Sequence, residues 1–135
     1  MDVGFSFIEK FKERFPERYF NFGVTEQTTI LMATAMALDG WKPYVYSMIN
    51  FVLFRPYEMV RNGICHHNAN VKLIGVQGSE KYKFLGFSHN ISPGEDTHVL
   101  EKLPNIEWYL PGDLVDVKGA LEASYERVGP AYIRL

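Results

Sequence analysis

The sequence predicts an α/β fold: a single three-layer α/β/α domain around a mostly parallel sheet. Strand-like and helix-like segments alternate along the chain, which is the pattern of β-α-β units with parallel strands. The 135 residues suffice for one domain with a buried core, so the domain is expected to span residues 1–135. Hydrophobic residues make up 47% and charged residues 22%, as in ordinary globular proteins.

The first half of the chain is expected to alternate helices with two short strands. Apolar residues recur at near-helical spacing over 5–15, where Pro16 ends the segment, and Asp39-Gly40 ends the helix over 25–38. The expected elements are a helix over 5–15 ended by Pro16, a strand over 19–22, a helix over 25–38, a strand over 44–47 and a helix over 54–68.

The second half repeats the alternation around one long loop. Residues 77–94 show no sustained periodicity and contain several glycines, and a loop of this length is often functional. Asp113 follows Pro-Gly and is a predicted N-cap. The expected elements are a strand over 71–76, the loop over 77–94, a helix over 95–103, a strand over 106–110, a helix over 113–128 and a strand over 131–135.

Composition excludes several classes of function. Fourteen basic and sixteen acidic residues give a net charge of −2, so nothing favours binding to nucleic acid or to an acidic membrane. The single Cys65 excludes an internal disulfide and suits a reducing compartment. No apolar run approaches the ~20 residues of a membrane span, and no signal-peptide pattern begins the chain. The sequence therefore predicts a cytoplasmic protein.

Candidate functional residues follow the predicted strands. In α/β sheets ligands gather at the carboxyl ends of parallel strands. Glu26 follows the first strand, the aromatic stretch 50–54 follows the second, and His89 lies in the loop after the third. Neighbouring His66 and His67 point to different helix faces, and no metal-ligand spacing occurs, so no metal site is predicted in this chain.

Four stretches of the chain carry a family resemblance. They are residues 15–27 (Phe-Pro-Glu-Arg-Tyr-Phe-Asn-Phe-Gly-Val-Thr-Glu-Gln), residues 42–54 (Lys-Pro-Tyr-Val-Tyr-Ser-Met-Ile-Asn-Phe-Val-Leu-Phe), Gly86-Phe-Ser-His89, and residues 103–113 (Leu-Pro-Asn-Ile-Glu-Trp-Tyr-Leu-Pro-Gly-Asp).

In this order, the four stretches resemble the pyrimidine-binding domain of transketolase-like, thiamine diphosphate-dependent enzymes, such as transketolase C-terminal sections and deoxyxylulose-phosphate synthases. The resemblance covers nearly the whole chain and implies the thiamine diphosphate-binding fold of pyrimidine type. Met1-Asp-Val-Gly4 resembles the end of the family's first strand, which implies an N-terminally truncated domain.

The resemblance implies a role for each site residue. Glu26 would share a proton with N1′ of the cofactor's aminopyrimidine and so activate the cofactor. Phe51 would stack on that ring, with Met48 and Phe54 as pocket walls, and His89 would relay protons on the substrate side. Each role has an ordinary alternative: Glu26 as an acidic first-turn residue, Phe54 as a core residue and His89 as a solvated loop residue.

The resemblance also implies an assembly. The Gly-Asp-Gly and Asn pattern that binds the metal in this family does not occur, so the diphosphate and its Mg²⁺ are expected on a partner diphosphate-binding subunit or domain. A dimer or larger homo- or hetero-oligomer is therefore expected, inactive without that partner. The apolar helix segment 30–38 suits either a partner interface or a buried central helix.

Three functions remain open. The first is the pyrimidine-binding portion of a transketolase-like transferase moving two-carbon ketol units, with a small ketose or keto-acid substrate. The second is the β subunit of a 2-oxo acid dehydrogenase, and the third is a non-catalytic binding or regulatory module of the same fold. The Leu-Pro-Asn-Ile and Gly-Phe-Ser-His stretches favour the first. The stretch Val76-Gln77-Gly78-Ser79 lacks the histidine that sugar-phosphate transketolases have there, and Leu85 replaces their aspartate, which keeps the third open.

Overall fold

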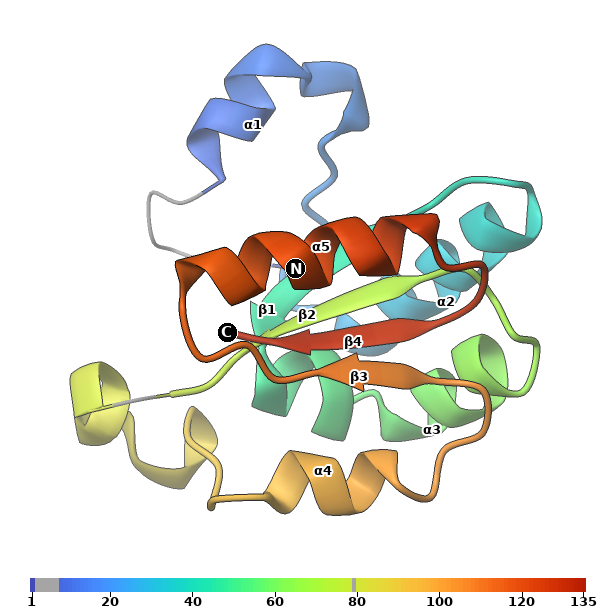
Figure 1. The fold of residues 1–135 in the computed structure, drawn as a ribbon. Coiled ribbons are helices and arrows are strands. Elements are labelled where there is room, and N and C mark those ends of the chain that lie inside the picture. Colours follow the sequence, from blue (N-terminus) through green and yellow to red (C-terminus); the bar gives the residue numbers. More distant parts are fainter. Residues whose placement is uncertain (2–7, 79) are drawn as a thin grey trace.

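Four parallel strands form one sheet in the computed structural model, which describes residues 1, 8–78 and 80–135 (Figure 1). Every neighbouring pair of strands in the order β1-β2-β4-β3 runs parallel. The strands are β1 (Tyr44–Met48), β2 (Lys72–Val76), β3 (Glu107–Tyr109) and β4 (Ala131–Arg134). The strands expected at 44–47, 71–76, 106–110 and 131–135 are confirmed to within one residue at each end.

Helices cover both faces of the sheet. Because β4 lies between β2 and β3, the chain reverses its direction across the sheet, and right-handed crossovers then place helices on opposite faces. Helix α5 (Leu114–Glu126) covers one face, while α2 (Glu26–Leu38), α3 (Tyr57–Met59) and α4 (Glu95–Leu100) lie on the other (Figure 1). The predicted α/β/α layering is confirmed.

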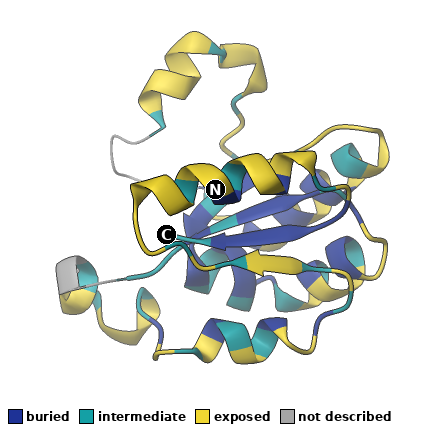
Figure 2. Cartoon of the chain, viewed as in Figure 1, coloured by how far each residue is buried: buried dark blue, intermediate teal, exposed yellow. Residues whose placement is uncertain are grey.

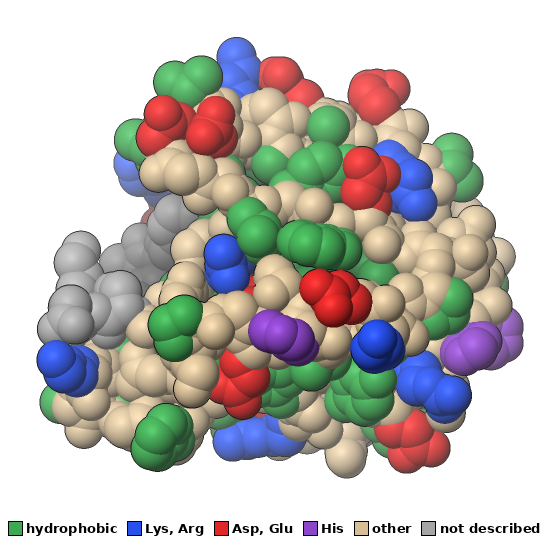
Figure 3. Space-filling view, turned by 60° about the horizontal axis from the view of Figure 1, so that its bottom comes forward, with side chains coloured by type: hydrophobic (Ala, Val, Ile, Leu, Met, Phe, Trp, Pro, Cys, Tyr) green, Lys and Arg blue, Asp and Glu red, His purple; other side chains and the backbone are tan. Residues whose placement is uncertain are grey.

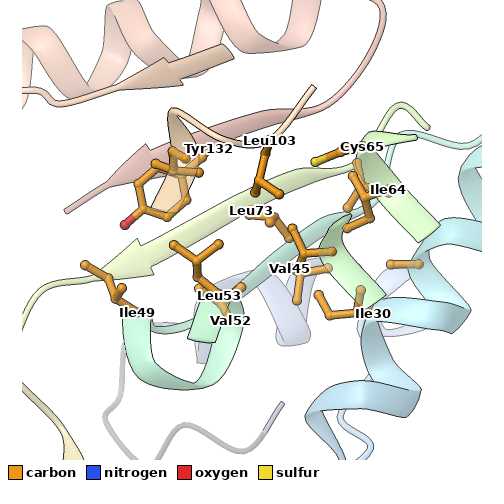
Figure 4. Packing of buried hydrophobic residues seen from close by; sticks show 14 of the residues in the cluster. Ile30, Val45, Ile49, Val52, Leu53, Ile64, Cys65, Leu73, Leu103 and Tyr132 are labelled. Carbon is orange, nitrogen blue, oxygen red and sulfur yellow. The ribbon is translucent and has the colours of Figure 1, made fainter. Parts of the chain in front are cut away.

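The main core lies between the sheet and the α2–α3 layer (Figure 4). Ile30 of α2, Val45 of β1 and Leu73 of β2 pack there with almost no exposure. Cys65 lies in the same cluster, and burial raises the pKa of its thiol to about 12. Helix α5, by contrast, is largely exposed in Figure 2.

Helix α2 has one buried and one exposed apolar face. Ile30 and Ala33 are buried in the core, whereas Leu31, Met32 and Leu38 are 50%, 40% and 61% exposed. The segment is therefore not a helix buried on all sides within this domain. An apolar helix face exposed in this way is unusual for an isolated domain.

The strand expected at residues 19–22 is wrong. No strand of the described sheet pairs with this segment, although Tyr19 has extended backbone angles. Alternating aromatic residues fit a strand pattern, but a strand forms only where a neighbour pairs its N–H and C=O groups. Instead the rings of Phe20 and Phe22 stack on each other, with centroids 6.0 Å apart.

The helix expected over 54–68 begins earlier and is irregular. It consists of a π-turn over Asn50–Phe54, the short α3 and a second π-turn over Val60–Cys65. Pro56 accounts for the first of these turns, because it lacks an N–H and its ring needs space in the preceding turn. The Arg55 N–H accordingly bonds to the Asn50 carbonyl at 2.9 Å, one residue further back than in an α-helix.

The remaining segments differ mainly at their ends. The long loop contains 3-10 turns over Glu80–Ser88, broken at Gly86 by a positive φ of 60°. Asp113 caps α5 as predicted: its carboxylate accepts from the N–H groups of residues 115 and 116 at 2.8 and 2.9 Å. Within the expected helix 5–15, α1 (Glu9–Arg14) forms without buried residues, and positions 2–7 lie outside the described residues. No helix of the described chain combines the length and apolar character that crossing a membrane requires.

Candidate functional site

Glu26 is the first residue of α2 and is only 8% exposed. Gly23, with a φ of 69°, makes the preceding turn, and the Thr25 hydroxyl donates to the Phe22 carbonyl at 2.8 Å. The turn and the helix start together hold the carboxylate against the protein at the amino end of α2, where a negative charge is favoured by the helix dipole.

Arg55 joins Glu26 to Phe51. Its Nη1 lies 2.7 Å from Oε1 of Glu26, and its guanidinium carbon lies 4.2 Å from the centroid of the Phe51 ring. The Glu26 side chain is 10% exposed and that of Arg55 49% exposed, so the ion pair stands at the border between protein and solvent.

His89 contacts the same aromatic ring. The His89 and Phe51 rings meet edge-on, with centroids 5.0 Å apart and an interplanar angle of 82°. Nδ1 of His89 lies 2.7 Å from the Ser88 hydroxyl, which donates its one proton to the Leu85 carbonyl. Nδ1–H must therefore donate to Ser88, which leaves Nε2 of a neutral imidazole as the proton acceptor.

The segment that carries His89 is fixed by backbone contacts. Nδ2 of Asn50 donates to the carbonyls of Phe87 and Asn90 at 3.1 and 3.2 Å, which ties the π-turn to the loop. Gly78 lies against the backbone of His89 so closely that a Cβ would overlap the His89 carbonyl oxygen and the Asn90 side chain. Asn50 and Gly78 thus hold His89 near Phe51.

Met48 and Phe54 stand three residues before and three residues after Phe51 in the chain. Met48 ends β1 and is 9% exposed. Phe54 closes the π-turn and packs, partly buried, against the core cluster, as Phe51 also does. The structure thus joins Glu26 to Phe51 through Arg55 and joins Phe51 to His89 by direct contact. Phe54 shares the core cluster with Phe51, and Met48 is close to Phe51 only along the chain.

The arrangement fits a planar nitrogen heterocycle. A guanidinium is a flat N–C–N group that donates to a carboxylate and stacks on an aromatic ring, and here it makes both contacts at once. An aminopyrimidine carries the same N–C–N unit in a flat ring. The described part of the chain also leaves the buried Oδ1 of Asn50 and Oγ of Ser47, both near the end of β1, without a hydrogen-bond partner.

Sequence reasoning missed Arg55. The sequence predicts that the helix begins at Phe54, so Phe51 lies outside it and no contact with Arg55 is expected. The helical segment in fact begins at Asn50, and residues four positions apart in a helical segment contact each other.

The rest of the described chain holds neither a metal-ligand cluster nor an extension of this group. Among the described residues, no three His, Cys, Asp or Glu side chains come together as metal ligands would. A shallow, open hollow of about 580 Å³ lies at the end of β3, the outer strand furthest from β1, and shares no residue with the group around Glu26. It is lined by Tyr109, Leu110, Pro111, Val115, Asp116, Gly119 and Ala120.

Known proteins resemble this chain over nearly its full length. One relative, a subunit of the apulose-4-phosphate transketolase of Actinobacillus succinogenes, is 30% identical over 95% of the chain. A 1-deoxy-D-xylulose-5-phosphate synthase of Listeria monocytogenes is 32% identical over 99% of the chain. The chain spans only 40% and 21% of the lengths of these curated relatives.

A solved structure shows the same likeness in three dimensions. It is described as a split-gene transketolase, an inactive beta4 tetramer, and matches with a TM-score of 0.83 and 32% identity. The match covers 99% of this chain and 43% of the solved chain. The sequence model of the family described as "Transketolase, pyrimidine binding domain" matches residues 3–135. The chain therefore belongs to the family of transketolase pyrimidine-binding domains.

Proposed function

We propose that residues 1–135 act as the pyrimidine-binding portion of a transketolase-like, thiamine diphosphate-dependent transferase that moves two-carbon ketol units. The observation that carries this proposal is the buried carboxylate of Glu26, linked through Arg55 to the Phe51 ring. A buried carboxylate beside an aromatic face is the recognition that an aminopyrimidine needs. Relatives described as transketolase and deoxyxylulose-phosphate synthase favour a transferase over a 2-oxo acid dehydrogenase component.

Each site residue has a distinct task in this proposal. When bound, the cofactor supplies the carbon nucleophile and electron sink for two-carbon transfer. Glu26 holds the proton shared with N1′ of the pyrimidine, and Phe51 stacks on the ring, with Met48 and Phe54 behind it. His89 accepts or returns a proton at Nε2 on the substrate side, because its Nδ1–H is held by Ser88.

The diphosphate and its Mg²⁺ are assigned to a partner diphosphate-binding subunit or domain. The exposed apolar face of α2 supports a partner there, since Leu31, Met32 and Leu38 are joined by Trp41, which is 55% exposed just after the helix. The net charge of the chain is only −2, so shape and apolar contact rather than one dominant charge would select the partner. Figure 3 shows charges of both signs interspersed on one face of the molecule. The relative described as one part of a transketolase and the split-gene tetramer are in line with such an assembly.

The test is reconstitution with a diphosphate-binding subunit that carries the Gly-Asp-Gly and Asn pattern. We expect the complex with thiamine diphosphate and Mg²⁺ to exchange the C2 proton of the cofactor faster than free cofactor does, by NMR. Glu26→Ala should reduce that exchange by at least about tenfold, because the shared proton is lost. Glu58→Ala, an exposed glutamate of α3, is the matched control. An unchanged exchange rate in Glu26→Ala would contradict the proposed role.

A further inference from the structure

We propose that Arg55 is an internal competitor for the aminopyrimidine subsite, which the cofactor ring must displace in order to bind. This inference rests on the proposed function and adds a residue that sets cofactor affinity. It starts from the finding that the Arg55 guanidinium already makes both contacts assigned to the ring: a hydrogen bond to Glu26 and a cation–π contact over the face of Phe51.

The two groups cannot both lie over the same face of Phe51. Nη1 of Arg55 lies 2.7 Å from Oε1 of Glu26, which is full hydrogen-bonding distance. The guanidinium carbon lies 4.2 Å from the Phe51 centroid, so no gap for another flat ring exists on that face. His89 contacts Phe51 as well, with the two ring centroids 5.0 Å apart and the rings nearly perpendicular. Binding of a heterocycle on the covered face therefore requires Arg55 to leave.

Arg55 is free to leave without unfolding its surroundings. Its backbone N–H is held by the Asn50 carbonyl at 2.9 Å, while its long side chain is 49% exposed and can rotate into solvent. The pair between Arg134 and Asp96 provides a contrast within the same chain. There the guanidinium is 23% exposed and the carboxylate fully buried, as expected of a permanent structural pair.

The strength of the contact suits a reversible competitor. A partly exposed ion pair and a cation–π contact each change an equilibrium by roughly two- to fivefold. Together they would weaken apparent cofactor affinity by about tenfold, because the binding-competent population falls by that factor. In return, the carboxylate of Glu26 keeps a counter-charge whenever no ring is bound, which avoids an unpaired buried charge.

The test is an NMR titration of the full chain with the free pyrimidine half of the cofactor, 4-amino-5-hydroxymethyl-2-methylpyrimidine. Arg55→Met keeps apolar bulk beside Phe51 but removes the charge and the donors. We expect it to bind the probe roughly three- to thirtyfold more tightly than wild type. In wild type, the Arg55 Nε–Hε signal should lose its ring-current shift as the probe saturates. Arg61→Met, at an exposed residue of the second π-turn, is the matched control and should bind the probe as wild type does.

The outcomes separate this inference from the proposed function. Equal or weaker probe binding by Arg55→Met, or an unmoved Arg55 signal at saturation, would overturn the competition. In the Arg55→Met background, Glu26→Ala should then weaken binding, because the carboxylate has only the probe as its partner. If that substitution has no effect, or if no variant binds the probe, the proposed function fails and the inference fails with it.

Discussion

The Tyr132 hydroxyl donates a 2.8 Å hydrogen bond to the Asp96 carboxylate, and neither residue has any exposed surface. Arg134 contacts the other carboxylate oxygen of Asp96 at 3.0 Å. The network joins α4 to the centre of the sheet, and α4 follows the segment that carries His89. Burial, and then the charge of Asp96, raise the pKa of Tyr132 far above its usual value.

We expect Tyr132→Phe to lower the free energy of unfolding by about 1.5–3 kcal/mol, the range for a buried hydrogen bond to a charged group. Asp96 would lose one of its two partners while remaining buried. Urea denaturation at pH 7 measures the effect. Tyr125→Phe, at a residue 52% exposed, is the control and should change stability by less than about 0.5 kcal/mol. Equal stability of the two variants would show that the network is not a stabilising element.

Lys72 should make stability depend on alkaline pH. Its ammonium is buried and donates to the Arg127 and Gly129 carbonyls at 3.0 and 2.6 Å. Burial, and then the charges of Arg127 and Lys42, lower the pKa of Lys72 to about 8 from 10.5. Between these values the unfolded chain binds more protons than the folded one, so this group increases stability as pH rises from about 8 to 10.5.

The measurement compares wild type with Lys72→Met across that range. The difference in unfolding free energy should widen in favour of wild type by at most about 1.4 kcal/mol per pH unit. Titration of the tyrosines affects both proteins and cancels in the comparison. A constant difference from pH 8 to pH 10.5 would show that the pKa of Lys72 is not lowered.

Two glycine substitutions should have opposite effects. Gly78→Ala forces a Cβ into the backbone of His89, so we expect a loss of about 1–3 kcal/mol in stability and a displaced imidazole. Gly119→Ala, inside α5, meets no atom within 4 Å and should stabilise the protein by about 0.5–1 kcal/mol. Thermal unfolding gives both values, and the ring-current shift of the His89 signals reports the displacement. Equal effects of both substitutions would contradict the tight packing at Gly78.

Asn50→Ala should loosen the loop that carries His89. The substitution removes the two hydrogen bonds to the Phe87 and Asn90 carbonyls, which together contribute about 1–3 kcal/mol. Hydrogen exchange should therefore accelerate at amides 84–90 and little elsewhere. Asn62→Ala, at an exposed residue of the second π-turn, is the control. Unchanged exchange in the loop would mean that it is held by other contacts.

The pair between Glu26 and Arg55 should be weak when measured as a coupling. A double-mutant cycle with Glu26→Gln and Arg55→Met should give about 0.2–1 kcal/mol, because the guanidinium is half exposed. High salt should reduce the coupling. A coupling above about 2 kcal/mol would show a fixed structural pair, and in that case cofactor binding could not release Arg55 as inferred above.

The order of elements was predictable because the signals that define it are local. The β-branched residues around Leu73 and the cap at Asp113 are sufficient to place β2 and α5. Glu26 was placed at the start of a helix for the same reason. The strand predicted at 19–22 is wrong because alternating aromatic residues do not show whether a neighbouring strand lies beside the segment to form hydrogen bonds with it.

The contact between Glu26 and Arg55 joins residues 29 positions apart, and no local pattern encodes it. It depends on where the turn after β1 begins, and Pro56 shifts that turn to Asn50. Likewise, the fit of Gly78 against His89 depends on the path of a long loop. The candidate site was therefore predictable as a set of residue types at one sheet edge, but not as a set of contacts.

The high exposure of α5 makes this helix a suitable place for chemical attachment. This helix buries only Ala120 and Ser124, and none of the proposed cofactor or partner contacts lies on it. Lys118 of this helix has a side chain that is 77% exposed. A fluorophore or surface tether attached there would leave α2 and the Glu26 region accessible. The chain can thus be immobilised through α5, while the opposite face of the sheet, with α2 and Glu26, stays accessible to other polypeptides or small molecules.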